Sequence, residues 1–147
     1  MSRKRVIEIM VALLILLFAY TGVSKLLDYT LFKNMLRLPP WSFPATIAGY
    51  IAALLPAGLL SIAIMLLIPS LRLKGLWLSL FTLLAFTVAI AILFLSGASL
   101  PCSCNGVFAG MSWEWHALFN AAFILLTIIT IGLYKLERWF IQQTTSA

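Results

Sequence analysis

The sequence has little charge. Only 10% of its 147 residues are charged, while 63% are apolar, and the mean hydropathy is +1.10. A water-soluble domain of this size could not cover its surface with so few polar side chains. The composition therefore excludes a soluble protein. It predicts a single integral membrane domain that comprises residues 1–147.

Side chains that bind metals are also scarce, with one histidine and two cysteines in the whole chain. One histidine excludes bis-histidine ligation of haem and leaves only a methionine as its partner. A closed zinc site needs about four ligands, and only Cys102, Cys104, Met111 and His116 are candidates. No second cysteine pair exists to relay electrons, which weakens the case for a complete oxidase that works alone.

What the sequence does contain is long apolar runs without the alternation of a transmembrane β-barrel. A membrane helix needs roughly 20 apolar residues. The first run should be retained rather than cleaved as a signal peptide, because it is too long and no small-residue cleavage site follows it. The sequence predicts an all-α protein, an integral membrane four-helix bundle. Its four spans are expected at residues 6–27, 44–68, 75–97 and 116–134.

Lysine and arginine are concentrated at the ends of these runs, so the net charge of +6 reflects topology and does not indicate nucleic acid binding. With the N-terminus inside, seven cations face the cytoplasm and three face outward. The positive-inside rule then predicts that both termini are cytoplasmic. The inner set is Arg3, Lys4, Arg5, Arg72, Lys74, Lys135 and Arg138, and the outer set is Lys25, Lys33 and Arg37.

Two segments outside the spans have distinct patterns. Residues 29–38 place Tyr29 and Phe32 on one side and charged residues elsewhere, which predicts a short amphipathic helix in the first outer loop, lying in the membrane interface. Residues 142–147 are polar and are expected to form a disordered tail.

Cys102 and Cys104 lie one residue apart in the segment Leu100-Pro-Cys-Ser-Cys-Asn-Gly106, between the third and fourth spans. The predicted topology places them outside, where a disulfide can persist. A disulfide across one intervening residue is expected to be strained, which makes it easier to reduce and more oxidising toward other thiols. The pair could therefore accept electrons from a partner and pass them to a membrane quinone.

Four polar residues are expected to lie near this pair. Lys25 and Asp28 lie at the end of the first span. If Lys25 pairs with Asp28 inside the bundle, its charge would favour a nearby thiolate or quinone oxygen. The simpler interpretation is that the Lys25 side chain snorkels to the membrane interface. His116 and Asn120 share a face of the fourth span. The imidazole could exchange protons with Cys104, or serve as a structural hydrogen-bond donor. Asn120 could also be a contact between helices.

Two alternatives to redox chemistry remain at this point. Cys102 and Cys104 with Met111 or His116 would form a soft site suited to Cu(I). A permanent disulfide could instead hold the loop in place without cycling.

The sequence resembles the MauE/DoxX-like membrane proteins. The resemblance is carried by the segment Phe18-Ala-Tyr-Thr-Gly-Val-Ser-Lys-Leu-Leu-Asp28, the turn Pro101-Cys-Ser-Cys-Asn-Gly106, the segment Ser112-Trp-Glu-Trp-His116, and Phe119-Asn120. It implies a four-helix bundle in a bacterial inner membrane. MauE-type members support maturation of methylamine dehydrogenase, whose small subunit is rich in disulfides, and DoxX members occur in membrane-associated oxidoreductase complexes.

The leading hypothesis is a membrane thiol–disulfide oxidoreductase whose Cys102/Cys104 pair, on the periplasmic side, exchanges electrons with a periplasmic partner. Lys25, Asp28, His116 and Asn120 would tune the site. The second hypothesis is a non-catalytic subunit or maturation factor of an envelope complex. The third is a membrane protein that binds Cu(I).

Overall fold

The computed structural model describes residues 2–97 and 113–146. Within these ranges helices are the only regular secondary structure, which confirms the all-α prediction. Four of the helices are long and apolar enough to cross a membrane. In chain order the elements are α1 (Arg3–Leu27), α2 (Tyr29–Leu36), α3 (Ala45–Leu67), α4 (Arg72–Leu95) and α5 (Trp113–Ser146).

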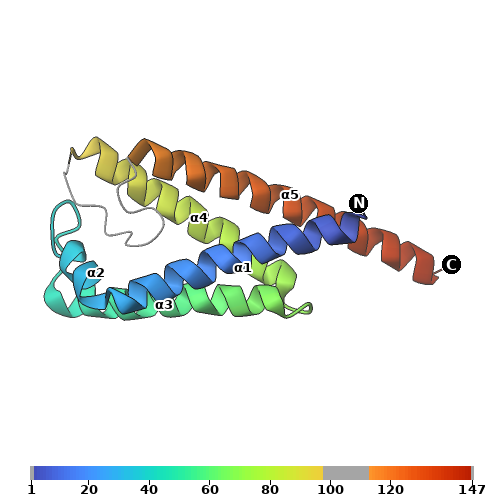
Figure 1. Ribbon diagram of the computed structural model, residues 1–147, viewed down its shortest axis with the longest axis horizontal. Helices are drawn as coiled ribbons and strands as arrows, with labels where there is room; N and C mark the ends of the chain where they lie inside the picture. Colours follow the sequence, from blue (N-terminus) through green and yellow to red (C-terminus); the bar gives the residue numbers. More distant parts are fainter. Residues whose placement is uncertain (1, 98–112, 147) are drawn as a thin grey trace.

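The four long helices form a bundle in which each contacts two neighbours. α1 packs against α3 and α5, and α4 packs against the same two helices from the other side (Figure 1). Both termini lie at one end, named here the terminal end. The opposite end, named the loop end, carries α2, the last turn of α4 and the first turn of α5. Cys102 and Cys104 lie outside the described residues.

The core follows the helical repeat of the sequence. Buried positions on α1 recur every three or four residues, which places them on the single face that meets the other helices. Because lipid is as apolar as these side chains, close van der Waals packing rather than escape from solvent holds them together. The core comprises Ile7, Val11, Leu14, Phe18, Leu59, Ile62, Ala63, Leu66, Leu76, Leu83 and Ile131.

Gly22 lies at a close approach between α1 and α3. A Cβ atom built on Gly22 would lie 2.9 Å from Leu60 Cγ and 3.3 Å from the carbonyl oxygen of Pro56. Only a residue without a side chain lets the two helices approach this closely. This contact lies two helical turns or less from Lys25 and so helps to fix the loop end of α1.

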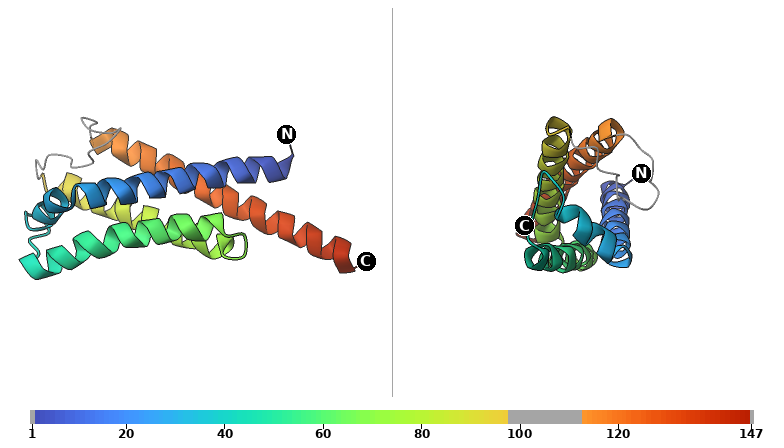
Figure 2. Two further views of the ribbon diagram at one scale, coloured as in Figure 1. Left: turned by 60° about the horizontal axis from the view of Figure 1, so that its bottom comes forward. Right: turned by 90° about the vertical axis from the view of Figure 1, so that its left-hand side faces the viewer.

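α2 confirms the short helix expected after the first span, although it ends at Leu36 rather than residue 38. It lies across the loop end beside α1 and α3 (Figure 2). The Tyr29 hydroxyl donates a hydrogen bond to the Gly49 carbonyl oxygen of α3 at 3.3 Å. The short helix is therefore fastened to the bundle as well as being amphipathic.

α5 is much longer than the sequence indicated. The expected span ended at residue 134, and residues 142–147 were expected to be disordered; the structure continues the helix to Ser146. The prediction for residues 142–146 was wrong because local polarity does not end a helix that has no glycine, proline or other breaker in its last turns.

Candidate functional site

The loop end brings together groups from the two ends of the chain. Lys25 lies in the last turn of α1, and His116 lies in the first turns of α5, 91 positions later in the sequence. Both side chains are half-buried. They are near enough for the Lys25 ammonium to act electrostatically on the His116 imidazole. The contact between α1 and α5 thus unites two of the residues expected to tune the cysteine pair.

Asp28 shapes the turn between α1 and α2. Its backbone N–H donates to Ser24 O at 3.0 Å, and its carbonyl accepts from the Phe32 N–H at 2.9 Å. The same residue therefore ends one helix and begins the next. Within residues 2–97 and 113–146, Asp28 forms no salt bridge with Lys25, so the expected pairing is not observed.

Lys25 instead has an aromatic partner. Its Nζ lies 4.7 Å from the centroid of the Phe32 ring on α2. An ammonium over a ring face is attracted by the ring quadrupole, a contact worth about 0.5–1 kcal/mol at an exposed site. The contact holds the cation at the loop end without neutralising it, so its full charge remains available to a nearby anion.

Asn120 has a clear structural partner. Its Nδ2 donates to Leu83 O at 2.9 Å and to Thr87 Oγ1 at 2.6 Å, and the side chain is buried. These bonds join α5 to α4 one turn below His116. The structure thus supports the role of Asn120 as a contact between helices, and through that contact it fixes the position of His116.

The sequence predicts a similar depth in the membrane for its four candidate polar residues, Lys25, Asp28, His116 and Asn120. It did not predict two of their partners, Phe32 for Lys25 and Thr87 for Asn120. Phe32 had been assigned only to the apolar side of α2. Its approach to Lys25 depends on the chain turning at Asp28, which no helical spacing predicts. Thr87 could not be found as a partner because one sequence carries no sign of which residue on α4 faces Asn120.

The described residues hold no preformed metal site. Among residues 2–97 and 113–146, no three His, Cys, Asp or Glu side chains come together in a group that could bind an ion. Tyr20 and Ser24 of α1 and His116 and Phe119 of α5 each take part in a further polar, electrostatic or ring interaction. The loop end thus offers a cation, which favours a nearby anion, and an imidazole, which can accept or donate a proton.

These features define a multi-pass membrane protein of four spans, with a short helix across the end where Lys25 and His116 meet. A family model described as "Methylamine utilisation protein MauE" matches residues 3–134, which is most of the chain and all four spans. The protein belongs to the MauE family. No curated protein and no solved structure matches it.

Proposed function

We propose that the protein is a membrane accessory factor for methylamine utilisation that exchanges disulfides with an envelope protein through Cys102 and Cys104. The observation that carries the proposal is the packing of α1 against α5, which brings Lys25 and His116 to the same end of the bundle, where the Lys25 charge acts on the imidazole. The segment that contains both cysteines leaves α4 and enters α5 at this same end. A nearby cation lowers the pKa of a cysteine and so favours the thiolate that carries out thiol–disulfide exchange.

The exchange balances without any other reactant. A partner thiolate attacks one sulfur of the Cys102–Cys104 disulfide and forms a mixed disulfide, and the other cysteine leaves as a thiolate. The second partner thiol then displaces the mixed disulfide. The partner is oxidised to a disulfide, and its two electrons and two protons end on Cys102 and Cys104. Lys25 stabilises the departing thiolate, and His116 passes the proton.

A membrane quinone is the proposed onward acceptor, but the groove between α3 and α4 offers it no free hydrogen-bond donor. A groove of about 350 Å³ between α3 and α4 is lined by apolar side chains and by Thr82. The Thr82 hydroxyl already donates to Leu78 O at 2.8 Å. The groove therefore lacks a donor for a quinone carbonyl, and no step of the exchange is assigned to it.

The proposed location is a bacterial inner membrane with the cysteine segment in the periplasm. Seven of the ten lysines and arginines belong to the terminal end, and by the positive-inside rule this excess supports a cytoplasmic position for that end. The partner would then be a periplasmic protein that requires disulfides.

A second function is favoured by the family description, which names a pathway and no reaction. In that case the protein is a non-catalytic subunit or maturation factor that binds its client through the loop end. The cysteine pair would then only hold its own segment in place.

Lys25→Met tests whether the pair is activated by this cation. A cation lowers the pKa of a nearby thiol, so its removal should move the pH profile of Cys102/Cys104 alkylation upward by about one unit. At a fixed pH below the midpoint, alkylation would slow about tenfold. The measurement is the alkylation rate of the reduced protein in detergent between acidic and alkaline pH.

Lys33→Met is the matched control. Lys33 is also half-buried at the loop end, but it lies beside Gly49 of α3. The lysine whose charge acts on His116 is Lys25. Removal of the Lys33 charge should leave the profile in place. Identical profiles for the Lys25 and Lys33 variants and the unsubstituted protein would contradict an activated pair.

A further inference from the structure

α5 is longer than a membrane requires. Its 34 residues, at about 1.5 Å each, extend roughly 51 Å, whereas the hydrocarbon core of a bilayer is about 30 Å thick. About 20 residues span that core, so the helix leaves it near Tyr134. The remaining residues, 135–146, are named here the arm. The arm extends beyond the first turn of α1 (Figures 1 and 2).

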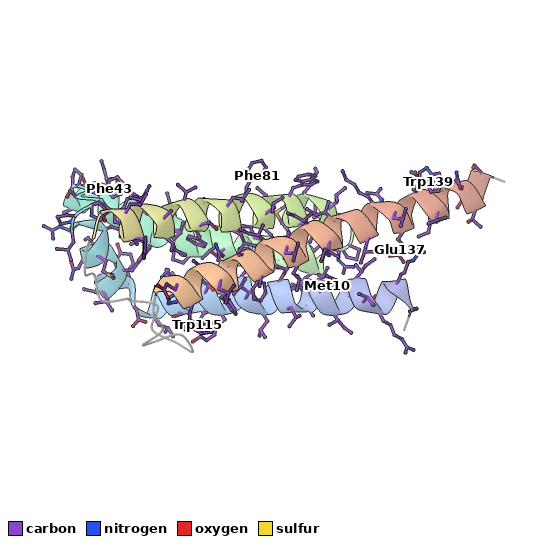
Figure 3. The ribbon with its side chains drawn as sticks, turned by 90° about the horizontal axis from the view of Figure 1, so that it is seen from above. Met10, Phe43, Phe81, Trp115, Glu137 and Trp139 are labelled. Carbon is purple, nitrogen blue, oxygen red and sulfur yellow. The ribbon has the colours of Figure 1, made fainter. Side chains whose placement is uncertain are left out.

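The arm carries large apolar side chains that are about half exposed in the described bundle. Trp139 is 51% exposed, Phe140 46% and Ile141 58%. Trp139 lies on the side of α5 away from α1, whereas Glu137 lies on the side toward α1 (Figure 3). Tryptophan and phenylalanine at a helix exit are typical of the interface, where one part of the ring contacts acyl chains and another contacts headgroups.

Cations surround the base of the arm and are held there by rings. Arg3 Cζ lies 5.5 Å from the centroid of Phe140, and Lys135 Nζ lies 5.2 Å from the centroid of Trp77 on α4. The Tyr134 hydroxyl donates to Pro69 O at 3.2 Å, which fixes the start of the arm against the turn before α4. The first and last helices and the start of α4 therefore place their basic residues around one segment.

The charge of this end is strongly unbalanced. It holds seven cations against the two carboxylates Glu8 and Glu137, a balance of +5. Neither cation–π contact neutralises its cation. A protein interface of ordinary composition is poor in lysine, whereas clusters of four to eight lysines and arginines next to a membrane helix are typical of binding to anionic lipid.

We propose that the arm and its surrounding cations bind the headgroups of anionic phospholipids in the leaflet at the terminal end. Arg3, Lys135 and Arg138 contact lipid phosphates, and Trp139 and Phe140 insert between headgroups. Residues 135–141 extend about 10 Å, more than the roughly 5–7 Å of headgroup region on each side of the hydrocarbon core, so the polar turn from Gln142 to Ser146 reaches water. The role is independent of the disulfide exchange proposed at the loop end.

The test uses a nitroxide at position 139, introduced by Trp139→Cys in a Cys102→Ser/Cys104→Ser background of the full chain. The labelled protein is placed in vesicles of phosphatidylcholine alone or of phosphatidylcholine mixed with phosphatidylglycerol. Collision of the label with a water-soluble nickel complex reports its exposure to water. A label at Thr145, in the polar last turn, is the control for general changes at the vesicle surface.

The label at position 139 should be shielded from nickel in the anionic vesicles and exposed in the neutral ones, whereas the label at 145 should be exposed in both. Lys135→Gln and Arg138→Gln should each lower the ratio of bound to water-exposed arm about fivefold, and high salt should act in the same direction. The proposal would be overturned if the label at position 139 were equally shielded in both kinds of vesicle, or equally exposed in both. Shielding that appears only with a co-purified protein would also overturn it and would identify a protein partner.

Discussion

Cys102→Ser/Cys104→Ser is expected to abolish disulfide exchange with the envelope partner while the protein still inserts and folds. The two cysteines are the only thiols in the chain, so no other group can carry the electrons. The core of the bundle is built from residues of α1, α3, α4 and α5 and does not depend on the pair. The measurement is the thiol state of envelope proteins, trapped with an alkylating reagent in cells that carry each variant.

The single variants separate exchange from a purely structural disulfide. With Cys104→Ser or Cys102→Ser, one attacking sulfur remains and the resolving sulfur is absent, so a mixed disulfide with the partner should accumulate in one of the two. The double variant should yield no such adduct. If partner oxidation continues unchanged in the double variant, the protein acts as a non-catalytic factor.

Gly22→Val is expected to destabilise the bundle more than any other single change at a glycine of α1 or α3. The Cβ alone would lie 2.9 Å from Leu60 Cγ, and the two added methyl groups cannot fit between α1 and α3. Overpacking of this kind costs about 1–3 kcal/mol. The measurement is the free energy of unfolding in mixed micelles, followed by helix content as the denaturing detergent increases.

Gly58→Val is the matched control, because Gly58 lies on α3 and nothing is within 4 Å of a Cβ built there. Its stability should stay within about 0.5 kcal/mol of the unsubstituted protein. Comparable losses in both variants would show that the cost arises from valine in the helix and not from the contact between α1 and α3. Gly22→Val should also disturb the loop end, since it displaces the helix that carries Lys25.

The four spans could be predicted from hydropathy because a bilayer demands long apolar helices and tolerates little else. The end of α5 could not be predicted in the same way, because polar residues do not end a helix whose last turns hold no breaker. Hydropathy predicts where a helix leaves the hydrocarbon core of the membrane, but it does not predict where the helix ends.

The candidate site could likewise be predicted only in part. That Lys25 and His116 lie at similar depth follows from their positions at the ends of spans on the same side. That they come close depends on α1 and α5 being neighbours in the bundle, which the order of spans does not determine. The aromatic partner of Lys25 was missed because only a pair with Asp28 or snorkelling to the interface was expected, and the turn at Asp28 brings Phe32 to the lysine instead.

The reduction potential of the Cys102/Cys104 pair tests the central claim most directly. Purified protein is equilibrated across a graded series of glutathione or dithiothreitol buffers, and free thiols are counted by alkylation. A pair that exchanges electrons with a partner should change from disulfide to dithiol at a mild potential, near about −200 mV. A disulfide that resists reduction below about −300 mV would contradict the claim and identify a structural bridge.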